Sequence, residues 1–276
     1  MKTLKYGLIA IASLSLMATS CRKKGCTDST AFNYSDEAKK DDGTCKYNNQ
    51  VTLQFTQSFN DENVTAGDYN QFKFTNAFGT KIAIERLRYS ISDVSFFKAD
   101  GDSVHVEMGH LIDLADATTL MHELSEKIDP VEYVGFSFIY GLTPDRNINE
   151  NFPEWNAVNW GWPQPLGLGF HQLQFDGEFI KTDGDTTGFN FHNGSNTQDP
   201  NDPSSAEPNY VYVRFDNNIE MNEDRTIEIG MQIDQWFENP NLWDLNVLGT
   251  NLMGNKAAQL DISENAGNVF EIVGVE

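Results

Sequence analysis

Apolar and polar residues alternate along several segments of the chain, with the two-residue period of a half-buried β-strand. The alternation is clearest over 51–57, which reads Val-Thr-Leu-Gln-Phe-Thr-Gln. Comparable segments lie at 82–97, 131–140, 169–175, 210–215 and 227–233. Turn-forming clusters of Asp, Gly, Asn and Pro separate them. The pattern predicts an all-β fold, an antiparallel β-sandwich with short helices and long loops.

Helical patterns are few, and two stretches have no regular pattern. The segments 115–127, 235–246 and 252–266 are the candidate helices. The irregular stretches are 142–168, which contains Trp155, Trp160 and Trp162, and 193–209, which is rich in Asn, Asp, Pro and Ser. Loops of this length inside a compact domain are often functional.

The N-terminus has the layout of an export signal. Two lysines precede the apolar run 6–17, and Ala-Thr-Ser then leads to Cys21. Small residues directly before a cysteine resemble a bacterial lipobox, in which cleavage leaves the cysteine to carry lipid. Ala18 departs from this pattern, because a larger aliphatic residue is usual there. We expect a lipoprotein signal peptide over 1–20, lipidation of Cys21, and a membrane-anchored exported protein, periplasmic or at the cell surface. An ordinary signal peptide followed by a structural cysteine is the alternative.

A short cysteine-bounded module follows at 21–45. With Cys21 lipidated, Cys26 and Cys45 form an even pair, which in an exported chain is most simply a disulfide. Such a crosslink stabilises by about 3 kcal/mol on the loop-entropy model. The sequence from Gly25 to Cys45 resembles a small Gly-Cys-Thr-Asp…Asp-Gly-Ser/Thr-Cys module of exported Bacteroidetes proteins. We expect residues 46–50 to be a linker and 51–276 to be the main domain.

Three acidic residues of this module are candidate calcium ligands. Asp28, Asp41 and Asp42 carry the hard oxygen atoms that calcium prefers. Asp and Gly also build turns without any ion. Both interpretations stay open.

Composition and charge narrow the function. Apolar residues make up 39% of the 276 residues and aromatic residues 12%, which is enough for a substantial core. The formal net charge of −22 argues against nucleic acid as a partner and leaves cation binding open. The chain has no Gly-x-Ser-x-Gly, no His-Glu-x-x-His and no zinc-type cysteine cluster. We therefore expect a binding protein rather than an enzyme.

Five histidines are the remaining candidates for chemistry. They are His105, His110, His122, His171 and His192. His105 alternates with apolar neighbours and is predicted to face solvent, as is His122 in its candidate helix. His171 shares the apolar face of its strand with Leu173 and Phe175, which is typical of a buried core histidine. His192 ends a strand at Phe-Asn-Phe-His, where an imidazole can bind copper or zinc.

From residue 51 onward the chain resembles the MbnP-like family of exported copper-binding β-sandwich proteins, relatives of the copper proteins CorA and MopE. The stretches that carry the resemblance are Leu-Arg-Tyr-Ser-Ile-Ser-Asp at 87–93, His-Leu-Ile-Asp-Leu at 110–114, Trp-Gly-Trp at 160–162 with Phe-Asp-Gly at 175–177, Phe-His-Asn-Gly at 191–194, and the closing Met253…Asn265…Phe270 segment. Their order and spacing follow the family. Residues 163–168 are longer than the family block, and Phe170 replaces its tyrosine.

The resemblance implies a copper site. In this family histidines bind copper, and kynurenine, made from a tryptophan with a di-haem peroxidase-like partner, can complete the site. The resemblance points first to His192, then to His110 and His171, with Trp160 or Trp162 as the modified tryptophan. A lipid-anchored interaction module without metal and a carbohydrate-binding module are the alternatives. Convergent imidazoles favour copper, whereas an exposed aromatic patch or flat exposed indoles favour the alternatives.

Overall fold

The computed structural model describes residues 22–167, 169–199, 202–207, 209–248, 250 and 252–276. The signal peptide expected over 1–20 and the lipidation expected at Cys21 lie outside the described residues. The chain divides into two compact units between Tyr47 and Asn48. In the described part, no helix is long and apolar enough to cross a membrane.

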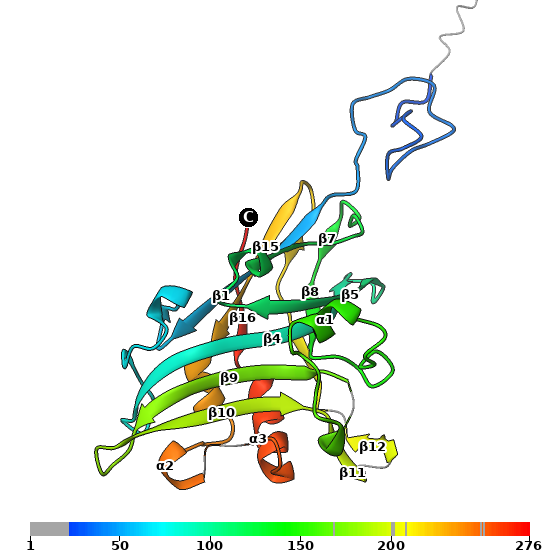
Figure 1. Cartoon of the computed structure of the whole chain (residues 1–276). Coiled ribbons are helices and arrows are strands. Elements are labelled where there is room, and N and C mark those ends of the chain that lie inside the picture. The colour runs from blue at the N-terminus through cyan, green and yellow to red at the C-terminus, as the bar shows by residue number, and fades with distance from the viewer. Residues whose placement is uncertain (1–21, 168, 200–201, 208, 249, 251) are drawn as a thin grey trace, which may run out of the picture. The chain divides into compact units, whose positions relative to one another are not determined.

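Two main sheets form the larger unit (Figure 1). The first contains, in spatial order, β16 (Phe270–Val275), β15 (Arg225–Gln232), β1 (Val51–Phe59) and β2 (Glu62–Asn63), and β6 (Met121–Glu123) also pairs with β1. The second contains β10 (Thr186–Gly194), β9 (His171–Ile180), β4 (Lys81–Phe97), β8 (Gly135–Tyr140) and β13 (Val211–Phe215), and β3 (Phe74–Thr75) and β5 (Ser103–Asp113) also pair with β4. The all-β sandwich is confirmed. Among the strands that the structure describes, β1 and β15 pair parallel and the other pairs are antiparallel.

Two further strand pairs are short. They are β7 (Glu132–Tyr133) with β14 (Ile219–Glu220), and β11 (Asn196–Asp199) with β12 (Asp202–Glu207).

Aromatic side chains from both sheets fill the core. The ring of Phe270 on β16 lies 5.2 Å from that of Phe138 and 5.8 Å from that of Tyr89, which come from the other sheet. Along β1, buried and half-buried residues alternate without a break from Val51 to Phe59. This is the alternation that the sequence predicts, and it places one face of β1 in the core.

The helices are short, as expected, but only one candidate segment is a long helix. The helical segments are η1 (Ala66–Asp68), η2 (Ala117–Leu120), α1 (Pro153–Ala157), η3 (Gln164–Leu166), η4 (Ile233–Phe237), α2 (Leu245–Leu248) and α3 (Lys256–Ala266). Asn255 caps α3 by accepting a hydrogen bond from the amide of Ala258 at 3.2 Å. The helix predicted over 115–127 is wrong: only η2 forms, and β6 follows it as a strand paired with β1.

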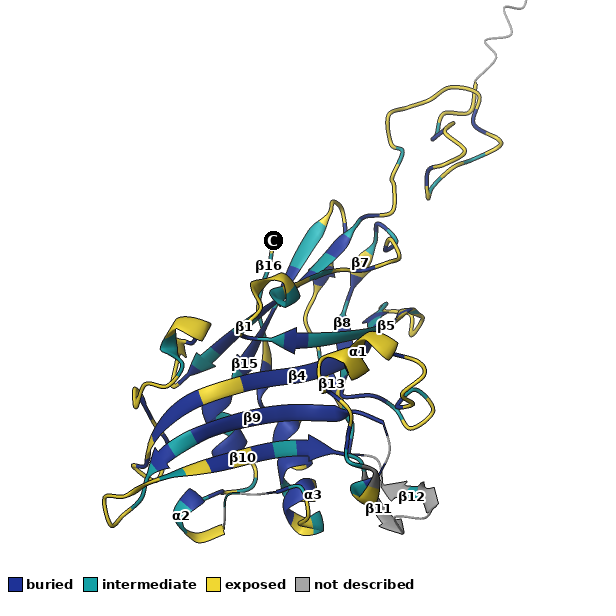
Figure 2. Ribbon diagram, in the orientation of Figure 1, coloured by how far each residue is buried: buried dark blue, intermediate teal, exposed yellow. Residues whose placement is uncertain are grey.

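A long loop covers the outer face of the second sheet. Residues 171–177 of β9 are all buried, unlike the alternating residues of β1, so β9 is covered on both faces (Figure 2). The cover is the irregular stretch around 142–170, which forms a second apolar cluster of Leu142, Phe152, Trp155, Trp160 and Phe170. Phe152 packs directly over Gly109 of β5, where a Cβ atom would lie 2.3 Å from the ring. The loop therefore buries polar side chains of the sheet beneath it.

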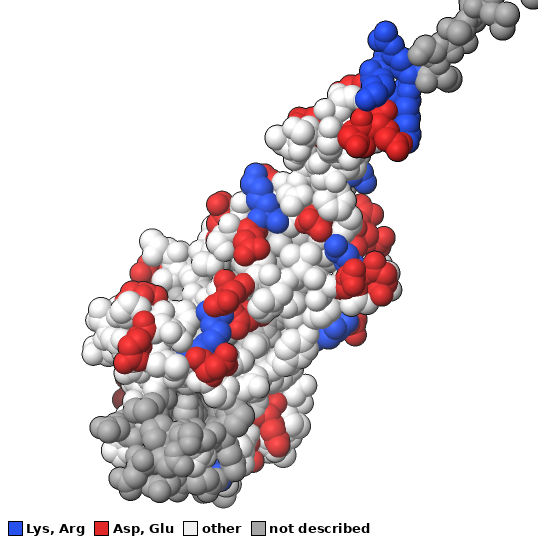
Figure 3. Space-filling view, turned by 90° about the vertical axis from the view of Figure 1, so that its right-hand side faces the viewer, with Lys and Arg blue, Asp and Glu red and all other residues white. Residues whose placement is uncertain are grey.

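Acidic residues outnumber basic ones, 41 to 19. On the face shown in Figure 3, Asp and Glu lie in several separate groups, some of them beside a Lys or Arg. Such dispersed charge favours solubility and attracts cations.

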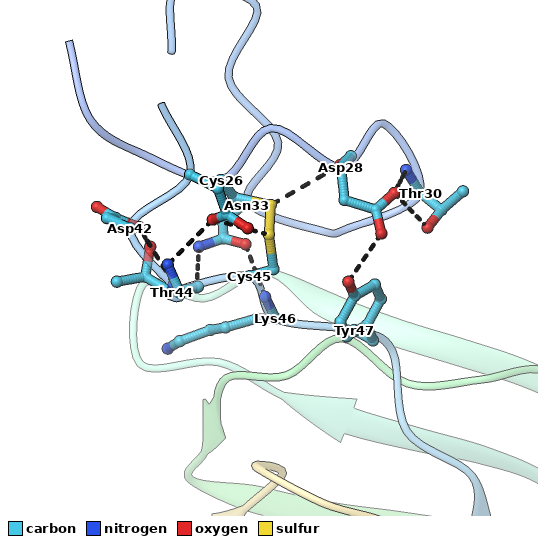
Figure 4. The surroundings of a disulfide bond; sticks show 11 residues. Cys26, Asp28, Thr30, Asn33, Asp42, Thr44, Cys45, Lys46 and Tyr47 are labelled. Carbon is cyan, nitrogen blue, oxygen red and sulfur yellow. Dashed lines mark hydrogen bonds between the residues drawn. A yellow bond between two sulfur atoms is a disulfide. The ribbon is translucent and has the colours of Figure 1, made fainter. Parts of the chain in front are cut away.

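The smaller unit is held by one disulfide. Cys26 and Cys45 are bonded, with Cα atoms 4.8 Å apart, which confirms the expected pairing (Figure 4). Lys46 and Tyr47, assigned to the linker, are hydrogen-bonded within this unit, to Asn33 and Asp28 respectively. The rest of the predicted linker, 48–50, belongs to the larger unit.

The three candidate calcium ligands take part in turns. Asp28 accepts hydrogen bonds from the backbone and hydroxyl of Thr30 at 2.9 and 2.8 Å, and Asp42 accepts in the same way from Thr44. Asp41 accepts from the amide of Gly43. These bonds are the Asx turns that the sequence offered as the alternative to an ion.

Candidate metal centre

An irregularity in the pairing of β9 with β10 decides where His171 points. Leu173 lies opposite Asn193, but the next pair along the ladder is His171 with Gly194. β9 therefore carries one extra residue, Gln172, which is a β-bulge. Because side chains alternate between the two faces of a sheet, the bulge turns His171 from the core face to the outer face. The expectation that His171 shares the face of Leu173 is wrong.

On the outer face, His171 meets His192 of β10. Their ring centroids are 5.3 Å apart, with the ring planes nearly perpendicular. His171 is buried and His192 is half-buried. The structure thus brings together two of the three histidines that the resemblance to the copper proteins indicates.

His192 is anchored by a carboxylate. Its Nε2 lies 2.8 Å from Oδ1 of Asp176 on the neighbouring strand β9. Burial alone would raise the pKa of Asp176, but hydrogen bonds from His192 and Asn190 lower it to about 2. The ionised carboxylate can only accept, so Nε2 carries the proton, and in the neutral ring Nδ1 carries the lone pair. A carboxylate that orients a histidine in this way is a common outer partner of metal ligands.

His171 is anchored by the backbone. Its Nδ1 donates to the carbonyl of Trp160 at 3.0 Å, which leaves the lone pair on Nε2. Burial lowers the pKa of His171 to about 4, although this hydrogen bond raises it somewhat. The ring is therefore neutral at neutral pH. It offers a nitrogen lone pair without competition from a proton.

Two tryptophan rings enclose His171. The ring of Trp162 lies 4.9 Å from it and that of Trp160 lies 5.5 Å from it, centroid to centroid. Both indole nitrogens are buried without a hydrogen-bond partner. This is unusual, since a buried indole N–H normally finds an acceptor. The extra residues that follow Trp162 do not displace the two tryptophans from the histidine.

Each tryptophan is held by a different contact. The guanidinium of Arg88 lies 5.1 Å above the ring of Trp160, and its Nη1 donates to the carbonyl of Val158 at 3.1 Å. Trp162 packs against Gly194, where a Cβ atom would lie 2.4 Å from its ring. Trp160 thus belongs to the covering loop, whereas Trp162 lies over the end of β10.

The other histidines lie elsewhere. His110, the third ligand candidate, has its ring contacts with Phe55 and His122 and not with His171 or His192. His122, predicted to be solvated on a helix, is half-buried on strand β6. His105 is exposed on β5, as expected, beside the hydroxyl of Ser95.

The side chains at this site supply two of the ligands that a metal ion needs, but not a third. Two imidazoles with anchored second nitrogens are typical ligands of copper. The described residues contain no group of three or more His, Cys, Asp or Glu that could hold an ion. An unmodified indole has no free lone pair to add a third donor.

Fold and site together define a β-sandwich protein in which paired histidines and tryptophans gather on the outer face of one sheet. The MbnP family model matches residues 48–254, and the chain belongs to that family. Among solved structures, MbnP from Methylosinus trichosporium is similar at 16% identity, covering 70% of this chain and 79% of that chain, with a TM-score of 0.49. No curated protein matches.

Sequence reasoning missed two residues of this region. In the sequence, Asp176 stands only as part of the Phe-Asp-Gly motif and Arg88 only as part of the Leu-Arg-Tyr motif. Asp176 and Asn190 face each other across β9 and β10, and so do Arg88 and Gln174 across β4 and β9. The strand register decides both pairings, and no local pattern in the sequence gives it.

Proposed function

We propose that this chain is an exported, lipid-anchored copper-binding protein that captures or stores copper and is not an enzyme. The observation that carries the proposal is the convergence of His171 and His192 beside two buried indoles. The residues that would hold copper are these two histidines. When bound, the metal would be held for storage or transfer, and the sandwich would serve as its rigid support.

The orientation of each imidazole supports this role. The carbonyl of Trp160 fixes the ring of His171, and Asp176 fixes that of His192. Fixed rings lose little freedom when they bind, which favours affinity. The covering loop buries His171, which is only 6% exposed, so little solvent competes for its lone pair.

The alternatives receive less support. Trp155, Trp160 and Trp162 are each at most 5% exposed. A carbohydrate-binding module would present flat indoles to solvent, and an interaction module would present an exposed aromatic patch. Neither arrangement occurs around these three tryptophans.

Copper(II) titration of the full mature chain, followed by electron paramagnetic resonance, tests the proposal. We expect one stoichiometric signal with nitrogen hyperfine structure, which His192→Ala and His171→Ala each abolish. His105→Ala is the matched control, because His105 is an exposed histidine on another strand. Weak, non-saturating binding that none of the substitutions changes would contradict a histidine copper site in the unmodified chain.

We further propose that Trp162 is the tryptophan converted to kynurenine. Its ring is the nearer of the two to His171, and among the described residues an arginine lies over Trp160 but not over Trp162. Two molecules of hydrogen peroxide would cleave the C2–C3 bond of the indole, adding two oxygen atoms and releasing two waters. Hydrolysis would then release the formyl carbon as formate and leave the aniline nitrogen. A di-haem peroxidase-like partner would catalyse the oxidation.

Mass spectrometry of the peptide that carries Trp160 and Trp162, after expression with such a partner, tests this step. We expect the modification on Trp162 and its loss in Trp162→Phe. Modification of Trp160 alone would contradict the assignment.

A further inference from the structure

A second pair of histidines lies on the inner side of the sandwich. The rings of His110 on β5 and His122 on β6 are 4.4 Å apart, centroid to centroid, and tilted by 34°. The ring of Phe55 on β1 stacks on that of His110 at 5.6 Å. Because Phe55 belongs to the core between the sheets, this pair is on the opposite face of the second sheet from His171 and His192.

The fold positions both rings of this pair. Nε2 of His110 donates to the carbonyl of Thr119 in η2 at 2.7 Å, which leaves the lone pair on Nδ1. Thr119 is itself fixed, since its hydroxyl accepts from the amide of Asp113 at 2.8 Å. His122 lies opposite Leu53 in the pairing of β6 with β1. The backbone of each histidine is therefore held by a strand, and His110 also has a fixed tautomer.

Both rings are half-buried, but only that of His122 is without a hydrogen bond to another described residue. His122 is half-buried on a three-residue strand that lies outside the main strand order of its sheet. No hydrogen bond to another described residue occupies its ring nitrogens. An ion from solvent can therefore reach the ring, and the ring can turn about its side-chain bonds without breaking a hydrogen bond.

We propose that His110 and His122 form a second metal site, which binds a borderline divalent ion, Cu²⁺ or Zn²⁺, through one nitrogen of each imidazole and water. Imidazole nitrogens bind such ions at about 2.0–2.1 Å, so the two nitrogens must lie within about 4 Å of each other. Ring centroids 4.4 Å apart bring the two imidazoles close enough for this, provided that the ring of His122 turns about its side-chain bonds while that of His110 stays on Thr119. With only two protein ligands, the site binds copper(II) more tightly than zinc, as the general order of affinities requires.

Protonation does not oppose this site at neutral pH. Burial lowers the pKa of His110 to about 4 and that of His122 below its ordinary value. Metal binding then displaces no proton from either ring. The acidic surface adds a general attraction for cations. A merely structural pair, packed on Phe55, would show no dependence on metal.

Zinc titration of the full mature chain by calorimetry tests the site, because zinc has no redox chemistry to complicate the result. We expect His122→Ala to lower zinc binding at this site by more than the roughly 10–100-fold that loss of an outer partner costs. His192→Ala should leave this site intact, so failure here is distinguishable from failure of the proposed copper site. His105→Ala, on the same strand as His110, is the matched control.

A second measurement does not depend on a variant that folds. Zinc added to the wild-type chain should shift the imidazole nitrogen resonances of His110 and His122 together, in a saturable manner. Zinc binding that is the same in His122→Ala and wild type, or imidazole resonances of His110 and His122 that do not move, would overturn the proposal.

Discussion

Asp176 accepts hydrogen bonds from three neighbouring side chains at the candidate site. Its Oδ1 accepts from Nε2 of His192 at 2.8 Å and from the side-chain Nδ2 of Asn190, and its Oδ2 accepts from Nε of Arg86 at 2.6 Å. The carboxylate is 8% exposed. Its low pKa means that these bonds favour the folded state at any pH above the ordinary value of 3.8, and that this contribution is lost as the pH falls toward 2.

Asp176→Asn should weaken both stability and copper binding. The amide can keep one acceptor, but the charge opposite Arg86 is lost and His192 loses its orienting partner. We expect a loss of about 1–3 kcal/mol in the free energy of unfolding, measured by urea titration of metal-free protein at pH 7. Copper affinity should fall by about 10–100-fold. Asp183→Asn, on an exposed turn, is the control, and equal effects of the two substitutions would refute this role of Asp176.

At the level of elements, Gly194 at the end of β10 provides the space that Trp162 fills. A Cβ atom there would lie 2.4 Å from the ring. Gly194→Ala should therefore displace Trp162 from His171 and cost about 1–3 kcal/mol of stability, as overpacking does. Denaturant unfolding monitors the stability, and near-ultraviolet circular dichroism monitors the indole.

Gly188, on the same strand, gives the matched comparison. A Cβ atom there would make only an ordinary contact, 3.6 Å from the carbonyl of Gly177. Gly188→Ala should leave the stability unchanged or slightly raised, since alanine costs less conformational entropy in a strand than glycine. If Gly194→Ala behaved like Gly188→Ala, the packing of Trp162 on this strand end would be refuted.

Most strands could be predicted from the sequence. Where one face of a strand is exposed the alternation shows it directly, as in β1, whereas β4 and β9 are buried on both faces over much of their length. β1 and β4 occupy nearly the segments predicted at 51–57 and 82–97. The errors arise where distant pairing decides the structure. β6 becomes a strand because its backbone bonds to β1, although its own residues also suit a helix.

The candidate site could be predicted as a list of residues but not as an arrangement. His171, His192 and the tryptophans were identified by their resemblance to copper proteins. The face of the sheet on which His171 lies depends on one extra residue in β9. His122 becomes the neighbour of His110 because its strand, β6, pairs with β1. A bulge shifts the side-chain alternation by one residue, and no periodicity in the sequence reports it.

At the scale of the whole molecule, two opposing effects govern stability in acid. The net charge of −22 destabilises the compact state by repulsion, and acidification relieves it. Buried histidines act in the other direction. In the metal-free chain, burial lowers the pKa of His171 to about 4, so between pH 6.5 and 4 the unfolded chain binds a proton at His171 that the folded chain does not. Stability from this residue is complete at pH 7 and is lost as the pH falls through that range.

Comparison of wild type with His171→Gln separates the two effects, because glutamine does not titrate and the surface charge is otherwise the same. We expect the difference in the free energy of unfolding between the two proteins to fall by about 3 kcal/mol from pH 7 to pH 4. Urea unfolding with a chelator present, at half-unit steps of pH, measures it. His105→Gln, at an exposed position, is the control. A difference that stayed constant with pH would show that His171 is not held neutral by burial, and the argument for an available lone pair at the site would fail with it.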